Sequence, residues 1–468
     1  MSEPLLLIKN GEIVTAEGRF QGDILCRGEK IVEISAARDV PEGAEVIDAT
    51  GRYVFPGFID PHVHITLPFM GTEAKDTWET AGKAALLGGT TALIEMVCPG
   101  RDEEPLEALA NWKSNAEGIA PCDYTFHMGV TRFDEGVEKQ LRQIVAEHHI
   151  TSFKVFLAYK GAFGIDDEEL YGILSLAAEL GVIVTAHCEN AELVSQLQAK
   201  LIAEGKTGPE WHEPSRPTSV EATGCHHFLT FAKLTGAHVY IVHTSCKDAV
   251  KIIRTAQKKG VKASIETVAP YLVLDRSFAE LPDFEGAKYV MSPPLREKHN
   301  QEFLWKALAD GTIATVGTDH APFDFETQKR MGDPASGGNF TTIPNGIPSV
   351  EERIKILYTH GVATKRISLE TLVRCGSTEA AKIFGLYPAK GTIAVSSDAD
   401  LVIWDPTYRG TLSQETQTMA TDYSAFEGME VIGRAETVVL RGKIVVENAA
   451  LVDTKPAGKH LDRSPGYL

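Results

Sequence analysis

Short apolar runs alternate with longer amphipathic segments through the middle of the chain, and this alternation predicts its fold. Eight runs are rich in β-branched and other apolar residues, as buried strands are. They cover residues 53–60, 91–96, 124–129, 152–157, 182–187, 239–243, 261–266 and 313–317. Segments between them, such as 167–180 and 218–235, carry apolar residues at helical spacing. The pattern predicts an α/β fold built on a (β/α)8 barrel. A doubly wound open sheet is the alternative, but no Gly-x-Gly-x-x-Gly follows an early strand.

The two ends of the chain follow a different pattern, which predicts strands without helices. Strand candidates at the start are 5–9, 12–15, 22–26 and 30–34, separated by turn signals at Asn10-Gly11 and Arg27-Gly28. Strand-like segments return at 391–394, 399–405, 436–441 and 443–447. We therefore predict that residues 1–52 and 386–456 meet in a small β-sandwich beside a barrel of residues 53–385. Residues 457–468 are predicted to be a tail, either mobile or an oligomer arm.

Composition narrows the range of partners and compartments. The 468 residues carry 46 Lys and Arg against 64 Asp and Glu, a net charge of −18, which disfavours nucleic acid and anionic membrane surfaces as partners. No apolar stretch approaches the roughly 20 residues of a membrane helix, and the start lacks the features of a signal peptide. Seven cysteines without Cys-x-x-Cys spacing indicate reduced thiols. We expect a cytoplasmic protein.

The strongest chemical signal is His62-Val63-His64, at the end of the first barrel run. Side chains two apart on a strand point the same way, so both imidazoles face one place, as half of a divalent metal site does. Sites in (β/α)8 barrels lie at the carboxyl ends of the strands, and four later runs carry or lead into a metal-competent residue. The predicted ligands are His62, His64, Lys154, His187, His243 and Asp319. Six polar groups favour two metals that share a bridging hydroxide.

Lys154 is the unusual member of this set. Burial and nearby cations would lower the pKa of its amine, and a neutral amine can add carbon dioxide to form an anionic carbamate that bridges two metals. The alternative is a lysine that reaches the barrel rim and pairs with a carboxylate. Asp60 is either a carboxylate that orients a histidine or a turn residue. We interpret His127 and His212 as structural histidines.

Several stretches together resemble the amidohydrolase superfamily, and within it the cyclic amidases, the dihydropyrimidinases and hydantoinases. They are Phe55–His64, Gly88-Gly89-Thr90-Thr91, Ser152-Phe153-Lys154, Ala186–Asn190, Val290–Arg296, Thr318–Phe323 and Pro344–Pro348. The resemblance covers nearly the whole chain. It implies a (β/α)8 barrel with a sandwich made from both termini, two zinc ions on the six residues above, carboxylation of Lys154 (N6-carboxylysine), and a homotetramer.

The same resemblance implies roles for three further residues. Tyr159 is similar to the tyrosine whose hydroxyl stabilises the oxyanion, and Ser292 and Asn345 match positions whose backbone groups hold the cyclic substrate. The chain also departs from related families. Dihydroorotases carry Arg where this chain has Thr66, and allantoinases carry Asn-Glu-Pro-Gly where it has Thr66-Leu67-Pro68-Phe69. Within the cyclic amidases, Ile94-Glu95-Met96 replaces the more usual Ile-Asp-Phe.

These features lead us to expect metal-dependent hydrolysis of a cyclic ureide or imide, a 5,6-dihydropyrimidine or a 5-substituted hydantoin, to the N-carbamoyl amino acid. Asp319 would shuttle the proton. The apolar walls expected around the ring substituent are Leu67, Phe69, Leu157 and Phe163. Allantoinase or another cyclic amidase is the alternative activity. A non-enzymatic, assembly-forming relative is the alternative from another class, but such relatives lack metal ligands that are all present here.

Overall fold

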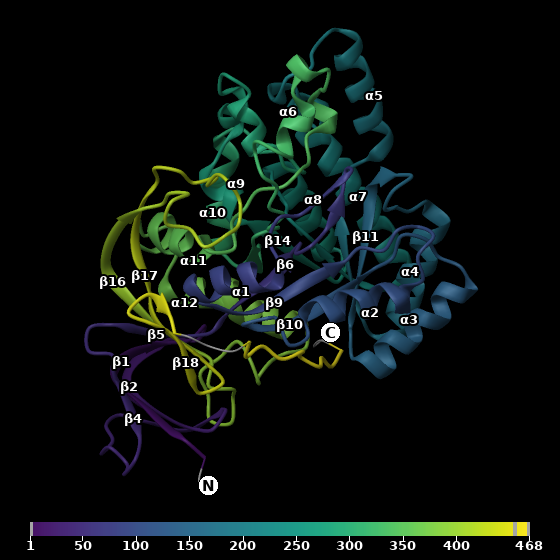
Figure 1. The fold of residues 1–468 in the computed structure, drawn as a ribbon. Coiled ribbons are helices and arrows are strands. Elements are labelled where there is room, and N and C mark those ends of the chain that lie inside the picture. The colour runs from purple at the N-terminus through teal and green to yellow at the C-terminus, as the bar shows by residue number, and fades with distance from the viewer. Residues whose placement is uncertain (1–2, 453–455, 466–468) are drawn as a thin grey trace.

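Eight parallel strands form the centre of the molecule in a computed structural model, which describes residues 3–452 and 456–465 (Figure 1). They are hydrogen-bonded in chain order. The two outer members of this order meet where His64 N–H donates to His320 O (2.7 Å) and Asp319 N–H donates to His62 O (2.9 Å). The sheet therefore closes on itself as a barrel, which confirms the predicted fold and excludes the open sheet. Its strands are β6 (Phe58–Val63), β9 (Thr90–Val97), β10 (Asp123–Gly129), β11 (Ser152–Lys160), β12 (Ile183–His187), β13 (His238–Ile241), β14 (Ala263–Val268) and β15 (Thr315–Gly317).

The first predicted barrel run is in fact two strands that belong to different sheets. Residues Tyr53–Pro56 form β5, which pairs with strands from both ends of the chain, and only β6 enters the barrel. The chain passes between the sheets at Gly57. A Cβ there would come within 2.1 Å of the Thr91 hydroxyl oxygen, so only glycine fits. The apolar pattern could not reveal this break, because both strands are buried.

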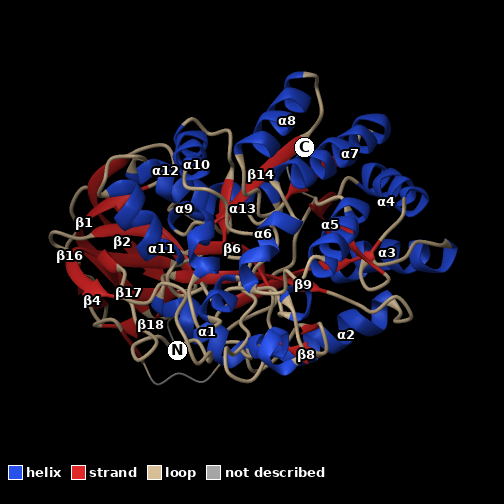
Figure 2. Ribbon diagram, turned by 90° about the horizontal axis from the view of Figure 1, so that it is seen from above, coloured by secondary structure: helices blue, strands red, loops and turns tan. Residues whose placement is uncertain are grey.

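Helices surround the barrel, as the view from above shows (Figure 2). Predicted segments 167–180 and 218–235 coincide with α4 and α7. Asp166 and Glu169 form a capping box at the start of α4, and Gly181 ends it with a left-handed backbone. The helices are α1 (Trp78–Leu87), α2 (Pro105–Ala116), α3 (Glu135–His148), α4 (Asp167–Leu180), α5 (Ala191–Ala203), α6 (His212–Ser215), α7 (Thr218–Thr235), α8 (Lys247–Lys258), α9 (Ala269–Val273), α10 (His299–Ala309), α11 (Arg353–Ile356), α12 (Leu369–Val373) and α13 (Glu379–Ile383).

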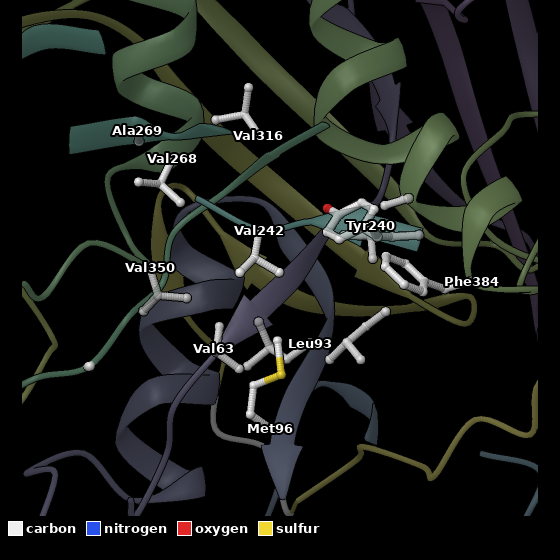
Figure 3. Packing of buried hydrophobic residues seen from close by; sticks show 14 of the residues in the cluster. Val63, Leu93, Met96, Tyr240, Val242, Val268, Ala269, Val316, Val350 and Phe384 are labelled. Carbon is white, nitrogen blue, oxygen red and sulfur yellow. The ribbon is translucent and has the colours of Figure 1, made fainter. Parts of the chain in front are cut away.

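Buried hydrophobic side chains from different strands pack together in one large core around the barrel sheet. Val63, Leu93, Tyr240 and Val316 are among the buried residues that converge from different strands (Figure 3). Tyr240 packs edge-on against Phe384, with ring centroids 5.0 Å apart. This packing fixes the strands, and with them the polar side chains at their ends.

The two ends of the chain meet in one module, as predicted, and its strands form a connected nine-stranded sheet with a small core of its own. Asn10-Gly11 is not a turn: β1 continues through it with a bulge, Asn10 taking a left-handed backbone (φ 61°). The segment 391–394 is not a strand either. The strands are β1 (Leu5–Val14), β2 (Arg19–Arg27), β3 (Lys30–Ser35), β4 (Glu45–Asp48), β5 (Tyr53–Pro56), β16 (Leu401–Thr411), β17 (Glu430–Leu440), β18 (Lys443–Glu447) and β19 (Ala450–Leu451). A separate hairpin is made by β7 (Pro68–Phe69) and β8 (Thr72–Glu73).

The end of the chain differs from the mobile tail or oligomer arm that the sequence predicted. Residues 458–463 lie against the chain's own barrel and pair with β10, and Figure 1 shows this yellow segment near that strand. Residues 453–455 and 466–468 lie outside the described part of the chain. Among the described helices, none combines the length and apolar character needed to cross a membrane. The limits predicted for the two modules, 52/53 and 385/386, stay a prediction.

Candidate metal centre

The six predicted ligand side chains converge at one end of the barrel. His62 lies in β6, Lys154 in β11 and His187 at the end of β12, while His64, His243 and Asp319 lie one or two residues beyond β6, β13 and β15. All six are buried. Residues that are up to 257 positions apart in the sequence thus reach one site because parallel strands end at the same face of the barrel.

His62, His64 and Asp319 form the first group. Asp319 Oδ1 lies 3.1 Å from His62 Nε2 and 3.2 Å from His64 Nε2. One ligand atom from each of the three residues lies within 4.8 Å of the others. His62 Nδ1 lies 2.8 Å from Glu266 Oε1 and donates to it, so Nε2 of a neutral ring carries a bare lone pair that faces the carboxylate. Two lone pairs in contact are repulsive, and a cation between them removes the repulsion.

The protonation of His62 supports this interpretation. Burial holds the pKa of His62 well below its usual value, with the Lys154 charge as the next cause, so the ring is neutral at pH 7. Its Nε2 atom is buried and has no hydrogen-bond partner among the described residues. A buried orphan nitrogen aimed at a carboxylate fits a divalent cation.

His187 and His243 form the second group. His187 Nδ1 lies 3.1 Å from His243 Nε2, and the ring centroids are 4.7 Å apart. His187 Nε2 lies 2.7 Å from Glu189 Oε2 and donates to it, which leaves Nδ1 as a lone pair that faces His243. The His243 ring also lies 5.4 Å from that of His62, so the two groups are adjacent.

Lys154 lies beside both groups and does not reach the rim. Its side chain is 1% exposed, and it forms no hydrogen bond or ion pair with any residue that the structure describes. Its Nζ lies 5.0 Å from the centroid of the Phe156 ring. Burial lowers the pKa of this amine, against the opposing effect of Asp319. A buried amine with no counter-ion in the described part of the chain differs from the rim ion pair that was the alternative.

Three residues around the centre have left-handed backbones that are rare outside glycine. The φ angles are 60° at Tyr159, 36° at His243 and 50° at Asp319. At Asp319 the conformation is held by its N–H bond to His62 O. Strain of this kind persists where the surroundings over-determine it, and it concentrates at functional sites.

Two buried glutamates that the sequence reasoning missed orient the histidines. Glu266 Oε1 contacts His62 Nδ1 and accepts from His243 N–H (2.8 Å), so one carboxylate joins both groups. Burial raises the pKa of Glu266 to about 7. Glu189 orients His187 and pairs with Arg216 (2.5 Å). The available signal was an acidic residue at or just beyond a strand end: Glu266 ends the run 261–266, and Glu189 follows His187 by two residues.

Asp60 and Glu95 act on backbone groups next to the ligands. Asp60 Oδ1 accepts from His62 N–H (3.2 Å), and its Oδ2 accepts from the Thr318 hydroxyl (2.6 Å). Asp60 is therefore more than a turn residue, although it orients backbone and not a ring. Glu95, from the unusual Ile94-Glu95-Met96, accepts from Ile65 N–H at 2.8 Å.

A cavity of about 50 Å³ lies between the metal-competent groups and the residues that the resemblance singled out. Tyr159, Ser292 and Asn345 line it, and Asn345 Nδ2–H donates to Ser292 Oγ (3.0 Å). Burial raises the pKa of Tyr159, which keeps its hydroxyl protonated as a donor. His212 also contacts this loop, through Met291 O (2.9 Å).

A larger cavity of about 690 Å³ adjoins the first. Phe69, Tyr159, Phe163 and Asn345 line both cavities, and the rings of Phe69 and Phe163 stack with centroids 6.0 Å apart. Leu67 lines the inner cavity as predicted. Leu157 faces the other side of its strand, and Phe156 lines the inner cavity instead. Alternation along the strand explains this one-residue difference.

Comparison with known proteins gives consistent matches over the whole chain. The model of the amidohydrolase family matches residues 53–445. A D-hydantoinase of Geobacillus stearothermophilus is 46% identical over 98% of this chain and 96% of its own length. A dihydropyrimidinase of Dictyostelium discoideum is 39% identical over 98% and 91%. The solved structure of a D-hydantoinase (dihydropyrimidinase) from Thermus sp. is 58% identical and covers 99% of this chain and 100% of its own, with a TM-score of 0.96.

Proposed function

The chain belongs to the amidohydrolase family, and we propose on that basis that it hydrolyses a cyclic amide, a 5,6-dihydropyrimidine or a 5-substituted hydantoin, to the N-carbamoyl amino acid. The observation that carries the proposal is the convergence, on one buried site, of bare imidazole nitrogens, a carboxylate and a lysine that has no partner among the described residues. Full-length relatives named D-hydantoinase and dihydropyrimidinase support the substrate class.

The donor set fits two divalent metals, and we propose zinc. His62 Nε2, His64 Nε2 and Asp319 Oδ1 would hold one ion, and His187 Nδ1 and His243 Nε2 the other. Lys154, carboxylated by carbon dioxide, would supply oxygens to both. When bound, the metal pair lowers the pKa of a shared water toward neutrality. Carboxylation is supported by the burial of an amine that has no counter-ion among the described residues.

Asp319 and Tyr159 would handle the proton and the carbonyl. Asp319 Oδ1 faces both histidines, which leaves Oδ2 to take the proton of the attacking water and return it to the leaving ring nitrogen. The protonated Tyr159 hydroxyl would donate to the carbonyl oxygen as negative charge develops there. Its left-handed backbone turns the ring toward His187, with ring centroids 5.1 Å apart.

The substrate ring would lie between the metal site and the loops of Ser292 and Asn345, whose backbone groups would bind the ring amide. The substituent would extend toward the stacked rings of Phe69 and Phe163. Position 66 is Thr, so this chain lacks the cation that binds an anionic ring in the dihydroorotases. A neutral ring with an apolar substituent therefore fits best.

The test compares dihydrouracil, phenylhydantoin and allantoin side by side on protein supplied with zinc and bicarbonate. We expect hydrolysis of dihydrouracil or phenylhydantoin, and its loss after chelation and in His62→Ala. His226→Ala, an exposed histidine of α7, is the matched control and should leave turnover unchanged. Preference for allantoin, or turnover that survives removal of all metal, would contradict the proposal.

Assembly and compartment are also proposed. The family resemblance supports a homotetramer, which light scattering on the purified chain can check. A cytoplasmic location is supported by the cysteines, since all seven are buried and unpaired.

A further inference from the structure

The C-terminal segment crosses the amino-terminal ends of two barrel strands, the end opposite the carboxyl ends of the strands. We call residues 458–463 the C-terminal strap. Four backbone hydrogen bonds hold it: Gly458 N to Ala120 O (2.9 Å), Tyr124 N to Lys459 O (3.0 Å), Leu461 N to Tyr124 O (2.8 Å) and Arg463 N to His149 O (3.2 Å). The strap therefore extends the barrel's own hydrogen bonding, and in Figure 1 it lies near β10.

The strap inserts a buried arginine into the barrel. Arg463 is 2% exposed and pairs with no carboxylate in the described part of the chain. Its Nη1–H donates to Ser152 Oγ (2.9 Å), and Nη2–H donates to Phe126 O. Burial lowers the pKa of this guanidinium to about 9. Burying a cation without a counter-ion costs free energy. Charge pairing therefore does not explain why Arg463 is buried against neutral acceptors.

Those contacts continue as a chain of hydrogen bonds with a single possible direction. Pro61 O can only accept, so His127 Nε2, 2.9 Å away, carries the ring proton. Burial and the Arg463 charge hold the pKa of His127 well below its usual value, so the ring is neutral and Nδ1 is an acceptor. Ser152 lies 2.5 Å from Nδ1 and must donate to it. Arg463, at the other end of this series of hydrogen bonds, can only donate.

This series of hydrogen bonds ends next to the proposed metal ligands. Pro61 immediately precedes His62, and Ser152 lies two residues before Lys154 on β11, so both side chains point to the same side of that strand. The His127 ring also packs edge-on against Phe384 (centroids 4.8 Å apart), which limits its rotation. Movement of Arg463 would thus be transmitted to the backbone of two ligands.

We propose that Arg463 is a positioning residue for the metal centre, acting from the C-terminal strap through Ser152, His127 and the Pro61 carbonyl. The inference rests on the proposed metal site. Neither Arg463 nor His127 is a proposed metal ligand or lines the inner cavity. Their role is to set where His62 and Lys154 lie. Loss of groups that orient metal ligands typically weakens metal binding 10- to 100-fold. Arg463, Ser152 and His127 contact neighbours of the ligands and not the ligand side chains themselves. We therefore expect about a 10-fold effect, at the lower end of that range.

The experiment measures zinc affinity by chelator competition on the full-length protein. Arg463→Met removes the donor to Ser152, and Ser152→Ala removes the hydrogen bonds to both Arg463 and His127. Each variant should weaken zinc binding about 10-fold, while Arg463→Lys, which keeps a donor, should retain most of the affinity. Lys459→Met is the matched control, because its side chain leaves the same strap toward Glu29 on the surface (2.7 Å). It should bind zinc as the unmodified chain does. The absorption spectrum of the cobalt-loaded protein should shift in Arg463→Met and not in Lys459→Met.

The outcomes separate the two proposals. Unchanged zinc affinity and an unchanged cobalt spectrum in a folded Arg463→Met would overturn the role of the strap and leave the metal centre standing. If Arg463→Met does not fold, Ser152→Ala decides in the same way, since it removes only one buried oxygen. An unmodified chain that binds no zinc would overturn both.

Discussion

Two clusters of buried charged and polar groups in this molecule are built in opposite ways. The junction cluster joins the barrel to the terminal sheet: Lys390 Nζ lies 2.6 Å from Asp123, 3.0 Å from Asp398 and 2.6 Å from Asp400, and Arg441 also pairs with Asp123. Its cations and carboxylates satisfy one another. The second cluster, which we call the metal layer, is formed by the six predicted ligands. Its imidazole nitrogens are bare and face a carboxylate, and its lysine has no partner among the described residues.

The difference separates a cluster whose charges satisfy one another from one whose donor atoms fit a metal ion. In the junction cluster, carboxylates around Lys390 raise the pKa of that lysine despite its burial. In the metal layer, burial lowers the pKa of Lys154. The same residue type is therefore a structural cation in one place and, in the other, an amine that we propose is carboxylated.

The largest effect is expected from Lys154→Ala. Removing the amine removes the proposed bridge between the metals, so metal-dependent turnover should be abolished. A short carboxylic acid should restore part of it by replacing the bridging oxygens. Turnover and zinc content per chain, with and without the acid, are the measurements. Full activity without any acid would contradict a carboxylated lysine.

Matched Lys→Met substitutions test the comparison through stability. Lys390→Met leaves buried carboxylates without a cation and should lower the free energy of unfolding by about 3–5 kcal/mol. Lys154→Met removes a buried amine that has no described counter-ion, and in metal-free protein it should be neutral or stabilising. Denaturant unfolding of both variants without metal checks this. Equal destabilisation by the two would show that the clusters do not differ as described.

Tyr159→Phe is expected to lower kcat by roughly 10²–10³ if its hydroxyl donates to the developing oxyanion. Zinc content and the free energy of unfolding should stay close to those of the unmodified chain, because the ring is retained. Steady-state kinetics on dihydrouracil or phenylhydantoin give the comparison. A rate that does not change would remove Tyr159 from the mechanism.

The last prediction concerns a buried acid outside both clusters, and its effect on stability changes with pH. Burial raises the pKa of Glu352 to about 8, with the neighbouring Glu351 as the next cause. An unfolded glutamate has a pKa of about 4.3, so the native state binds the extra proton between these values. This contribution to stability is complete below about pH 4.3 and is lost as pH rises through about 8, with a slope of at most about 1.4 kcal/mol per pH unit.

Glu352→Gln should abolish that slope, because the amide does not ionise. Unfolding free energies measured from pH 5 to pH 9 test this, with the exposed Glu415→Gln as the control. A slope that persists unchanged in Glu352→Gln would assign it to other groups.

The sequence was sufficient to predict the barrel and the convergence of the six residues of the metal layer, because both follow from local patterns. Strand runs predict the barrel, and the barrel places strand ends at one face. Contacts between distant strands were not predictable in this way. Glu266 orients His62 across 204 positions of sequence, and Arg463 contacts Ser152 across 311. A local sequence pattern carries no information on pairs so far apart. The split at Gly57 was hidden because two buried strands follow one another without a polar break.

The most direct test of the paired metal centre is a crystal structure of the protein grown with zinc and bicarbonate, with data collected at the zinc absorption edge. Two anomalous peaks should lie among His62, His64, His187, His243 and Asp319, with density for a carboxylated Lys154 side chain between them. A single peak, or an unmodified Lys154 amine beside two bound metals, would contradict the account.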